Sequence, residues 1–210
     1  MNRYYQLPLG ELGANCYIIP AEDGKAVVVD PASSAEVLMF LQSNDLSLGA
    51  IVITHGHFDH FAGVPALVRE TGAEVIAPLL DKEMLQSADK SWADFMPRTT
   101  FEPVFPDRTF SDGEEFSACG LTFGVMGAPG HTAGSCLLIC KTLGDVALTG
   151  DVIFAGAIGR FDGYSASVSD TRATLKKIAA LKGDYTLLCG HGEATSLSFE
   201  KQNNVYLAEA

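Results

Sequence analysis

His55-Gly56-His57-Phe58-Asp59-His60 places three imidazoles and one carboxylate within six consecutive residues. A lone histidine is usually an ordinary polar residue, but this one stretch holds three of the chain's five histidines. Neutral imidazole nitrogens and carboxylate oxygens are ligands that divalent metals such as zinc prefer, and a short loop can direct several of them to one point. The stretch therefore predicts a metal site, and we expect the fold to be organised around it.

The composition limits the classes of protein to which the chain can belong. With 210 residues, 47% of them apolar, the chain is expected to form one domain spanning residues 1–210. Its 26 acidic and 14 basic residues give a net charge of −12, which disfavours nucleic acid as a partner. No apolar run approaches the roughly 18 residues of a membrane span, and the first residues lack the apolar core of a signal peptide. We therefore expect a cytoplasmic protein with no membrane partner and with cysteines that remain thiols.

Apolar runs and amphipathic segments form two groups, each with strands and helices. Strands are expected at 4–9, 16–19, 26–29, 50–54, 74–77, 121–126, 135–140, 145–149 and 185–189. Helices are expected after Ser33 or Ser34, from Asp59 to about Thr71, near 79–86, from Asp170 or Thr171 to about Leu181, and at 198–207. Two such groups favour an α+β sandwich of the αββα type, with two β-sheets packed face to face and helices outside.

Four of the apolar runs end in a residue that can bind a metal. They are Ala50–Thr54 before His55, Leu121–Pro129 before Gly130-His131, Val146–Thr149 before Gly150-Asp151, and Thr186–Cys189 before Gly190-His191. Glycine lets the backbone turn sharply and brings the following side chain close to an ion. Because strand ends that meet at one edge of a sheet commonly build a site, we expect these residues to lie together.

In this order, the motifs resemble those of the metallo-β-lactamase superfamily: His55-x-His57-x-Asp59-His60, Gly130-His131-Thr132, Gly150-Asp151 and Gly190-His191-Gly192. The resemblance covers essentially the whole chain and implies two mixed β-sheets with a metal pair at one edge. It implies that His55, His57 and His131 bind the first ion, that Asp59, His60 and His191 bind the second, and that Asp151 bridges them. The implied cofactors are two divalent ions, zinc first, with iron or manganese as alternatives.

Within the superfamily, Gly150-Asp151-Val152-Ile153-Phe154 followed by Gly159-Arg160 resembles the short glyoxalase II-like (hydroxyacylglutathione hydrolase-like) thioesterases. Flavin-linked diiron members carry Glu at the position of His57, and true β-lactamases usually carry Cys at that of Asp151. The helical region that binds glutathione in full-length glyoxalase II has no clear counterpart after His191. The resemblance therefore implies a thioesterase but leaves the thiol part of its substrate open.

The implied reaction is the attack of a hydroxide, shared by the two ions, on an acyl carbonyl, most simply that of a small-molecule thioester. Asp59 and Asp151 are the expected catalytic carboxylates, with Asp59 also orienting the attacking water. Three alternatives stay open. They are a lactone or other ester hydrolase, a persulfide dioxygenase with one iron on His55, His131 and Asp151, and a metal-stabilised scaffold without activity. The sequence does not predict the oligomeric state.

Two further features have more than one interpretation. Arg160 is the one basic residue next to the motifs, and it can pair with a substrate carboxylate or form a structural contact with Asp162. Residues 87–107 mix aromatic side chains with three prolines and contain no glycine. Such a segment can cover an active site and touch substrate, or it can pack its aromatic side chains on the body of the domain.

Overall fold

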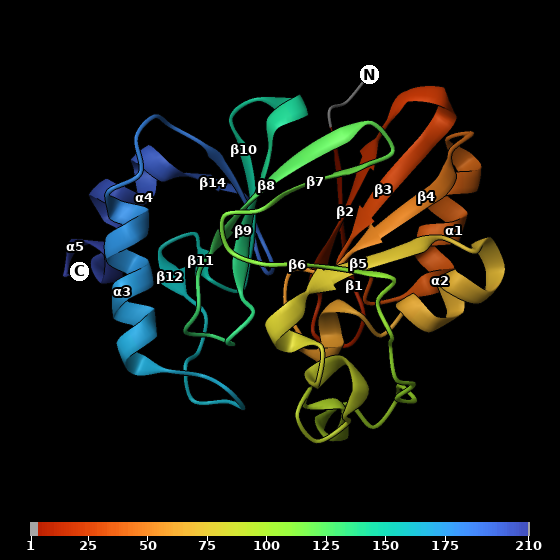
Figure 1. The fold of residues 1–210 in the computed structure, drawn as a ribbon, viewed down its shortest axis with the longest axis horizontal. Coiled ribbons are helices and arrows are strands. Elements are labelled where there is room, and N and C mark those ends of the chain that lie inside the picture. Colours follow the sequence, from red (N-terminus) through yellow and green to blue (C-terminus); the bar gives the residue numbers. More distant parts are fainter. Residues whose placement is uncertain (1–3, 210) are drawn as a thin grey trace.

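The computed structural model describes residues 4–209, which form two six-stranded β-sheets packed face to face with helices on both outer sides (Figure 1). The first sheet has the order β1 (Tyr5–Leu9), β2 (Ala14–Pro20), β3 (Lys25–Val29), β4 (Ser47–Val52), β5 (Glu74–Pro78) and β6 (Arg108–Phe110). Its strands pair antiparallel from β1 to β3 and parallel from β3 to β6. This sheet is therefore mixed, as expected.

The second sheet is also mixed. Its order is β14 (Thr195–Ser196), β13 (Thr186–Cys189), β10 (Val146–Gly150), β9 (Cys136–Cys140), β8 (Leu121–Gly127) and β7 (Glu115–Ala118). The β10–β13 pair is parallel and the other pairs are antiparallel. A separate hairpin pairs β11 (Ile153–Phe154) with β12 (Ala157–Ile158).

Helices cover the two outer faces. On the first sheet these are α1 (Ser34–Ser43) and α2 (Val64–Thr71), and on the second they are α3 (Val168–Ala179), α4 (Leu197–Asn203) and α5 (Val205–Ala208) (Figure 1). Short 3₁₀ turns occupy Glu22–Gly24, Phe58–His60, Leu79–Asp81, Met84–Gln86, Ala93–Phe95 and Lys141–Leu143. No helix within residues 4–209 is both long and apolar enough to cross a bilayer.

Three apolar layers hold the sandwich together, and strand β3 shows how one sequence serves two of them. Successive strand residues point to opposite faces, so Val27 and Val29 join the layer between the sheets while Val28 joins the layer under α1 and α2. A strand buried on both faces must be apolar at every position, which is why 26–29 is a continuous apolar run. A third layer, which includes Leu187 of β13 and Ile178 of α3, lies beneath the helices of the second sheet.

The αββα prediction is confirmed, while several element boundaries were wrong. Helix α2 begins at Val64 rather than at Asp59, because the Asp59 carboxylate faces histidines of the site instead of capping a helix. The expected helix near 79–86 is a pair of separate 3₁₀ turns. The C-terminal helix is broken at Asn204, whose side chain accepts from Tyr206 N–H and caps α5. The described residues contain no disulfide, as the expectation for the cysteines requires.

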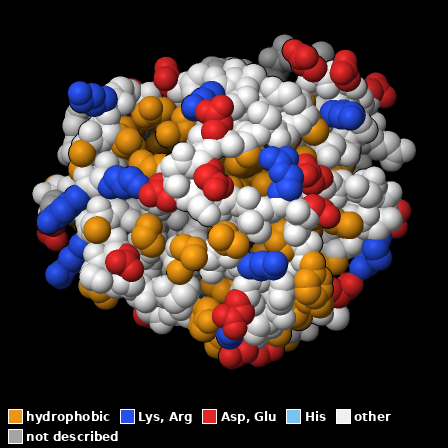
Figure 2. All heavy atoms as spheres, viewed as in Figure 1, with side chains coloured by type: hydrophobic (Ala, Val, Ile, Leu, Met, Phe, Trp, Pro, Cys, Tyr) orange, Lys and Arg blue, Asp and Glu red, His pale blue; other side chains and the backbone are white. Residues whose placement is uncertain are grey.

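The surface mixes both signs of charge. On the face shown in Figure 2, acidic and basic side chains are interspersed with hydrophobic ones, and the described residues drawn there form no continuous basic surface. Such a face does not present the basic stripe that follows a nucleic-acid backbone.

Candidate metal centre

The site lies where loops from both sheets meet. Residues 55–60 follow β4 in the first sheet, while His131, Asp151 and His191 follow β8, β10 and β13 in the second. All seven side chains predicted as ligands are brought together there, and six of them fall into two three-residue groups whose ligand atoms lie within 4.8 Å of one another.

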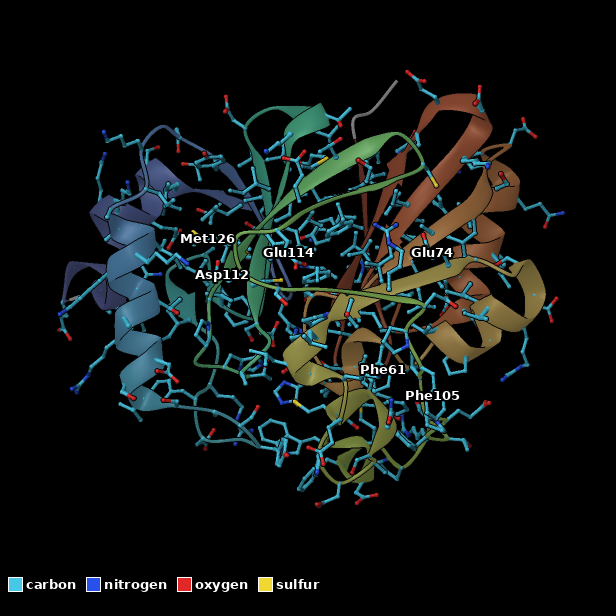
Figure 3. The ribbon with its side chains drawn as sticks, viewed as in Figure 1. Phe61, Glu74, Phe105, Asp112, Glu114 and Met126 are labelled. Atoms are coloured by element: carbon cyan, nitrogen blue, oxygen red, sulfur yellow. The ribbon has the colours of Figure 1, made fainter. Side chains whose placement is uncertain are left out.

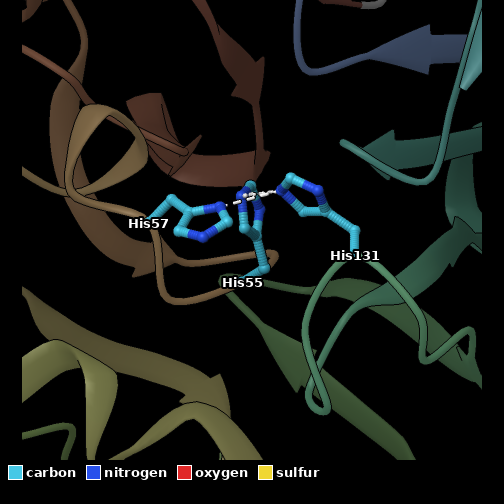
Figure 4. A group of neighbouring side chains, drawn as sticks. All are labelled: His55, His57 and His131. Atoms are coloured by element: carbon cyan, nitrogen blue, oxygen red, sulfur yellow. Dashed lines mark hydrogen bonds between the residues drawn. The ribbon is translucent and has the colours of Figure 1, made fainter. Parts of the chain in front are cut away.

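The first group consists of His55, His57 and His131, which direct ring nitrogens at a common point (Figure 4). His131 Nε2 lies 2.8 Å from His57 Nδ1 and 3.3 Å from His55 Nε2. Two nitrogens that bind one tetrahedral zinc at about 2.0–2.1 Å are roughly 3.3 Å apart, so this spacing is close to that of a metal site.

The second group consists of Asp59, His60 and His191, and Asp151 lies between the two groups. Asp59 Oδ2 is 3.3 Å from His191 Nε2 and 3.6 Å from His60 Nε2. Asp151 Oδ1 is 3.4 Å from His60 Nε2, while Oδ2 is 3.5 Å from His131 Nε2 and 3.6 Å from His191 Nε2. The two oxygens of Asp151 thus face histidines of both groups.

Unsatisfied buried atoms indicate that these residues fit metal ions. His60 Nε2 and Asp151 Oδ1 are buried and face each other, and neither has a hydrogen-bond partner among the described residues; His57 Nε2 is likewise unpaired. Leaving a buried polar atom without a partner costs about 1–3 kcal/mol. A divalent cation between His60 and Asp151 would satisfy both atoms, and the donor set of imidazoles and carboxylates suits zinc or iron.

The electrostatics keep most of these groups in the form that binds metal. Burial lowers the pKa of His55 well below its usual value and that of His57 to about 3, so both rings are neutral. Burial by itself would raise the pKa of Asp151, but His60 and other histidines outweigh it and hold the pKa well below the ordinary value. Burial also opposes the shift at His60, where the carboxylates of Asp151 and Asp59 raise the pKa.

Asp30, which the sequence analysis missed, orients two of the histidines. It follows β3, and its Oδ2 lies 3.0 Å from His60 Nδ1, which leaves His60 Nε2 facing the site. Thr54 donates to Asp30 from its backbone N–H at 2.8 Å and from its hydroxyl at 2.6 Å, and Thr54 Oγ1 lies 3.1 Å from His55 Nδ1. Such partners fix the tautomer and the orientation of a ligand ring.

Asp81, also missed, joins the loops of the two sheets. This buried carboxylate accepts from Gly56 N–H at 2.8 Å, from Gly134 N–H at 2.7 Å and from Thr132 Oγ1 at 2.6 Å. One side chain thereby holds the loop of His55 and His57 against the loop that follows His131. In addition, His131 Nδ1 lies 2.7 Å from the Arg160 carbonyl oxygen, to which it can donate.

Close contacts require all three glycines noted before ligand residues, and two of them lie against the site itself. A Cβ at Gly190 would lie 2.2 Å from Asp151 Oδ1, and a Cβ at Gly150 would lie 2.5 Å from Thr54 Oγ1. Gly150 also has a φ of +47°, a conformation that side chains disfavour. Larger residues at either position would displace Asp151 or its surroundings.

A cavity of about 570 Å³ opens above these residues. It is lined by five candidate ligands (His57, Asp59, His131, Asp151, His191) and by Leu12, Trp92, Phe95, Met96, Phe154, Gly159 and Arg160. Segment 87–107 is divided between the cavity and the body of the domain. Trp92, Phe95 and Met96 line the cavity, whereas Phe101 packs against the body of the domain at Phe58.

Arg160 also lines the cavity, but its guanidinium is engaged. Its Nε and one terminal nitrogen donate to the carboxylate of Asp162 at 2.7 and 3.1 Å, and its Cζ lies 4.3 Å from the centroid of the Trp92 ring. The interpretation of Arg160 as a structural arginine paired with Asp162 matches this geometry.

Known proteins resemble the chain over nearly its full length. Hydroxyacylglutathione hydrolase GloC of Haemophilus influenzae is 30% identical over 207 residues, which cover 96% of each chain. The crystal structure of the BLEG-1 B3 metallo-beta-lactamase superposes with a TM-score of 0.89 at 28% identity and covers 97% of this chain and 99% of its own. TTHA1623 in a di-iron-bound form gives a TM-score of 0.85 at 29% identity, with coverage of 95% and 98%. ETHE1 from Myxococcus xanthus gives 0.77 at 26%, with coverage of 98% and 84%.

The sequence model of one family matches residues 9–191, a range that begins at the end of β1 and includes every candidate ligand. Members of this family bind divalent metal ions, and most of them are hydrolases. The chain belongs to the metallo-beta-lactamase superfamily.

Proposed function

We propose that the chain hydrolyses small-molecule thioesters with two divalent cations, zinc first among the candidates. The proposed ligands are His55, His57 and His131 for one ion and Asp59, His60 and His191 for the other, with Asp151 bridging. The observation that carries the proposal is the position of Asp151, whose oxygens face His60 on one side and His131 on the other at 3.4 and 3.5 Å. A lone structural ion would not require a carboxylate placed in this way.

The protein's own groups have distinct tasks in this proposal. Bound divalent cations would lower the pKa of a water and polarise the substrate carbonyl. Asp59, which lines the cavity, is placed to accept a proton from the attacking water and to orient it. Asp30 and Thr54 hold the rings of His60 and His55 in fixed tautomers, so the site is preorganised before substrate enters.

Thioesters are favoured over other acyl compounds by similarity, and the lining of the cavity supports water as the nucleophile. The chain is 30% identical to a hydroxyacylglutathione hydrolase over its length. The described lining of the cavity contains no Ser, Cys or Lys that could attack a carbonyl, which leaves an activated water as the nucleophile. A small-molecule substrate also suits a cavity of about 570 Å³.

The test begins with metal content. Elemental analysis of the purified protein should give two divalent ions per chain, and a thiol assay should detect hydrolysis of S-lactoylglutathione or of a simpler thioester. Asp151→Ala should abolish that hydrolysis. Protein with two ions that releases no thiol from any thioester in the panel, but hydrolyses lactones, would replace the thioester proposal with a lactonase.

One alternative uses the same residues differently. A persulfide dioxygenase would bind a single iron at His55, His131 and Asp151, and the distances of 3.3 and 3.5 Å from His131 Nε2 to His55 and Asp151 are compatible with it. Oxygen consumption with glutathione persulfide and one iron per chain would establish this alternative. Two zinc ions per chain and release of thiol from a thioester would exclude it.

A further inference from the structure

The cavity has an apolar wall that the metal chemistry does not require. Leu12 comes from the loop between β1 and β2, Trp92, Phe95 and Met96 come from segment 87–107, and Phe154 comes from β11. Leu12 is 60% exposed and Phe95 is 79% exposed. Large apolar side chains left in water around one cavity indicate a ligand surface rather than a core.

The wall flanks the row of candidate ligands at both ends. The ring of Trp92 stacks on His57 with centroids 4.6 Å apart, and the ring of Phe154 meets His191 edge-on at 6.0 Å. Trp92 also contacts Phe95, at 6.4 Å between centroids. A carbonyl held beside the candidate ligands would therefore have aromatic surface within reach of its substituents.

Away from the candidate metal ligands, the described lining offers no unpaired cationic side chain that could bind an anionic part of a substrate. Apart from Gly159 and the apolar wall, the described lining consists of five candidate ligands and Arg160. The carboxylate of Asp162 already takes two donors of the Arg160 guanidinium. The two carboxylates of a glutathione moiety would find no unpaired cation on this wall.

We propose that this wall binds the hydrocarbon part of an acyl group, so that the preferred substrates are thioesters of medium-chain or aromatic carboxylic acids rather than of small hydroxy acids. The inference rests on the proposed function, since it assigns the acyl group of the same reaction. The carboxylate that the reaction releases carries the same hydrocarbon part and should bind the wall as well.

The expected effect follows from burial of methylene groups. A buried methylene contributes about 0.8 kcal/mol, which is about fourfold in affinity. Octanoate has six more methylenes than acetate. Burial of half of them on the wall would make octanoate bind roughly 60-fold more tightly than acetate.

Binding is the first measurement, because it does not depend on turnover. Isothermal titration of the zinc-loaded protein with acetate and with octanoate gives the ratio of their dissociation constants. The same ratio is measured in Phe95→Ala, in Leu12→Ala on the opposite loop, and in the control Phe105→Ala. Phe105, labelled in Figure 3, lies in segment 87–107, is 68% exposed and is not among the residues that line the cavity.

We expect each variant of the wall to lower the ratio severalfold and Phe105→Ala to leave it as in wild type. In parallel, kcat/KM for N-acetylcysteamine thioesters should rise from the acetyl to the octanoyl compound. A ratio near one in the wild type, or an equal ratio in Phe95→Ala and wild type, would overturn the inference. Thioester hydrolysis that does not depend on chain length would overturn the inference alone, whereas tight octanoate binding without any thioester hydrolysis would overturn the proposed function.

Discussion

The indole of Trp92 lies nearly parallel to the imidazole of His57, with ring centroids 4.6 Å apart and an interplanar angle of 14°. Trp92 adopts a φ of 66°, in the left-handed region that bulky residues rarely occupy. The same indole has the Arg160 guanidinium over it, and a Cβ at Gly163 would lie 2.5 Å from its ring. The strained backbone thus positions an aromatic ring directly against a candidate metal ligand.

Trp92 is the only tryptophan in the chain, so its fluorescence should report on metal at His57. We expect removal of metal with a chelator to change the emission, because the charge next to the stacked indole changes when His57 loses the ion. Added zinc should restore the emission. Fluorescence titration measures the effect, and Trp92→Phe, which has no indole, provides the blank. Emission that is the same with and without bound metal would show that no ion binds at His57.

The charge on Asp30 should determine how tightly metal binds. Asp30→Asn can keep an acceptor for Thr54 but replaces the charged partner of His60 Nδ1. Loss of such a partner typically weakens metal affinity about 10- to 100-fold. Competition with a chromophoric chelator measures this affinity.

Asp45→Asn is a matched control, because Asp45 has a φ of 54°, close to the 53° of Asp30, but is exposed and outside the site. It should bind metal like the wild type. Equal affinities in the two variants would mean that Asp30 does not support the ligand ring.

Asp30 also shows which parts of the site the sequence can predict. Four of the seven predicted ligands directly follow an apolar run or the glycine after it, and Asp30 follows Ala26–Val29 in the same way. That signal was present, but Asp30 was not considered as part of the site. Asp81 offered no comparable signal, because its partners Gly56, Thr132 and Gly134 lie 25 to 53 residues away in the chain.

The predicted start of helix α2 was wrong for a related reason. Asp59 has the side chain and the position of a helix cap, but its carboxylate faces His191 and His60, so local propensity yields to the site. The strands were easier to predict because burial on both faces imposes an apolar run whatever the partners are.

Asp81 should contribute to folding as well as to the site. An amide in Asp81→Asn has one acceptor oxygen and would place an NH₂ group against the donors that the carboxylate accepts. We expect a loss of about 2 kcal/mol or more in the free energy of unfolding, measured by urea denaturation. Asp94→Asn, at an exposed position, should change it by less than about 0.5 kcal/mol. Equal stabilities would contradict the role of Asp81 in joining the loops.

Asp112, labelled in Figure 3 beside α3, gives a pH-dependent prediction. The backbone N–H of Gly127 lowers the pKa of the Asp112 carboxyl, and with the ammonium of Lys177 it outweighs the opposing effect of burial. A lowered pKa in the folded state stabilises the protein above the unfolded pKa, near 4, and this stabilisation is lost as the pH falls through the folded pKa. Asp112→Asn should therefore cost less than about 1 kcal/mol at pH 7, because the site is exposed, and this cost should shrink as the pH falls below the unfolded pKa. A difference from wild type that stays constant over this pH range would contradict the prediction.

Asp151→Asn separates a two-ion centre from a one-ion site. The amide is nearly isosteric with the carboxylate but carries no charge and has only one oxygen, so it cannot face His60 and His131 with equivalent acceptors. We expect the metal content to fall from two ions to one or fewer and kcat/KM for a thioester to fall at least about 100-fold. Asp162→Asn, which changes a carboxylate paired with Arg160 outside the ligand set, serves as the control and should keep both ions. If Asp151→Asn retained two ions and full activity, Asp151 would not bridge the groups, and the two groups of ligands would have to act as independent sites.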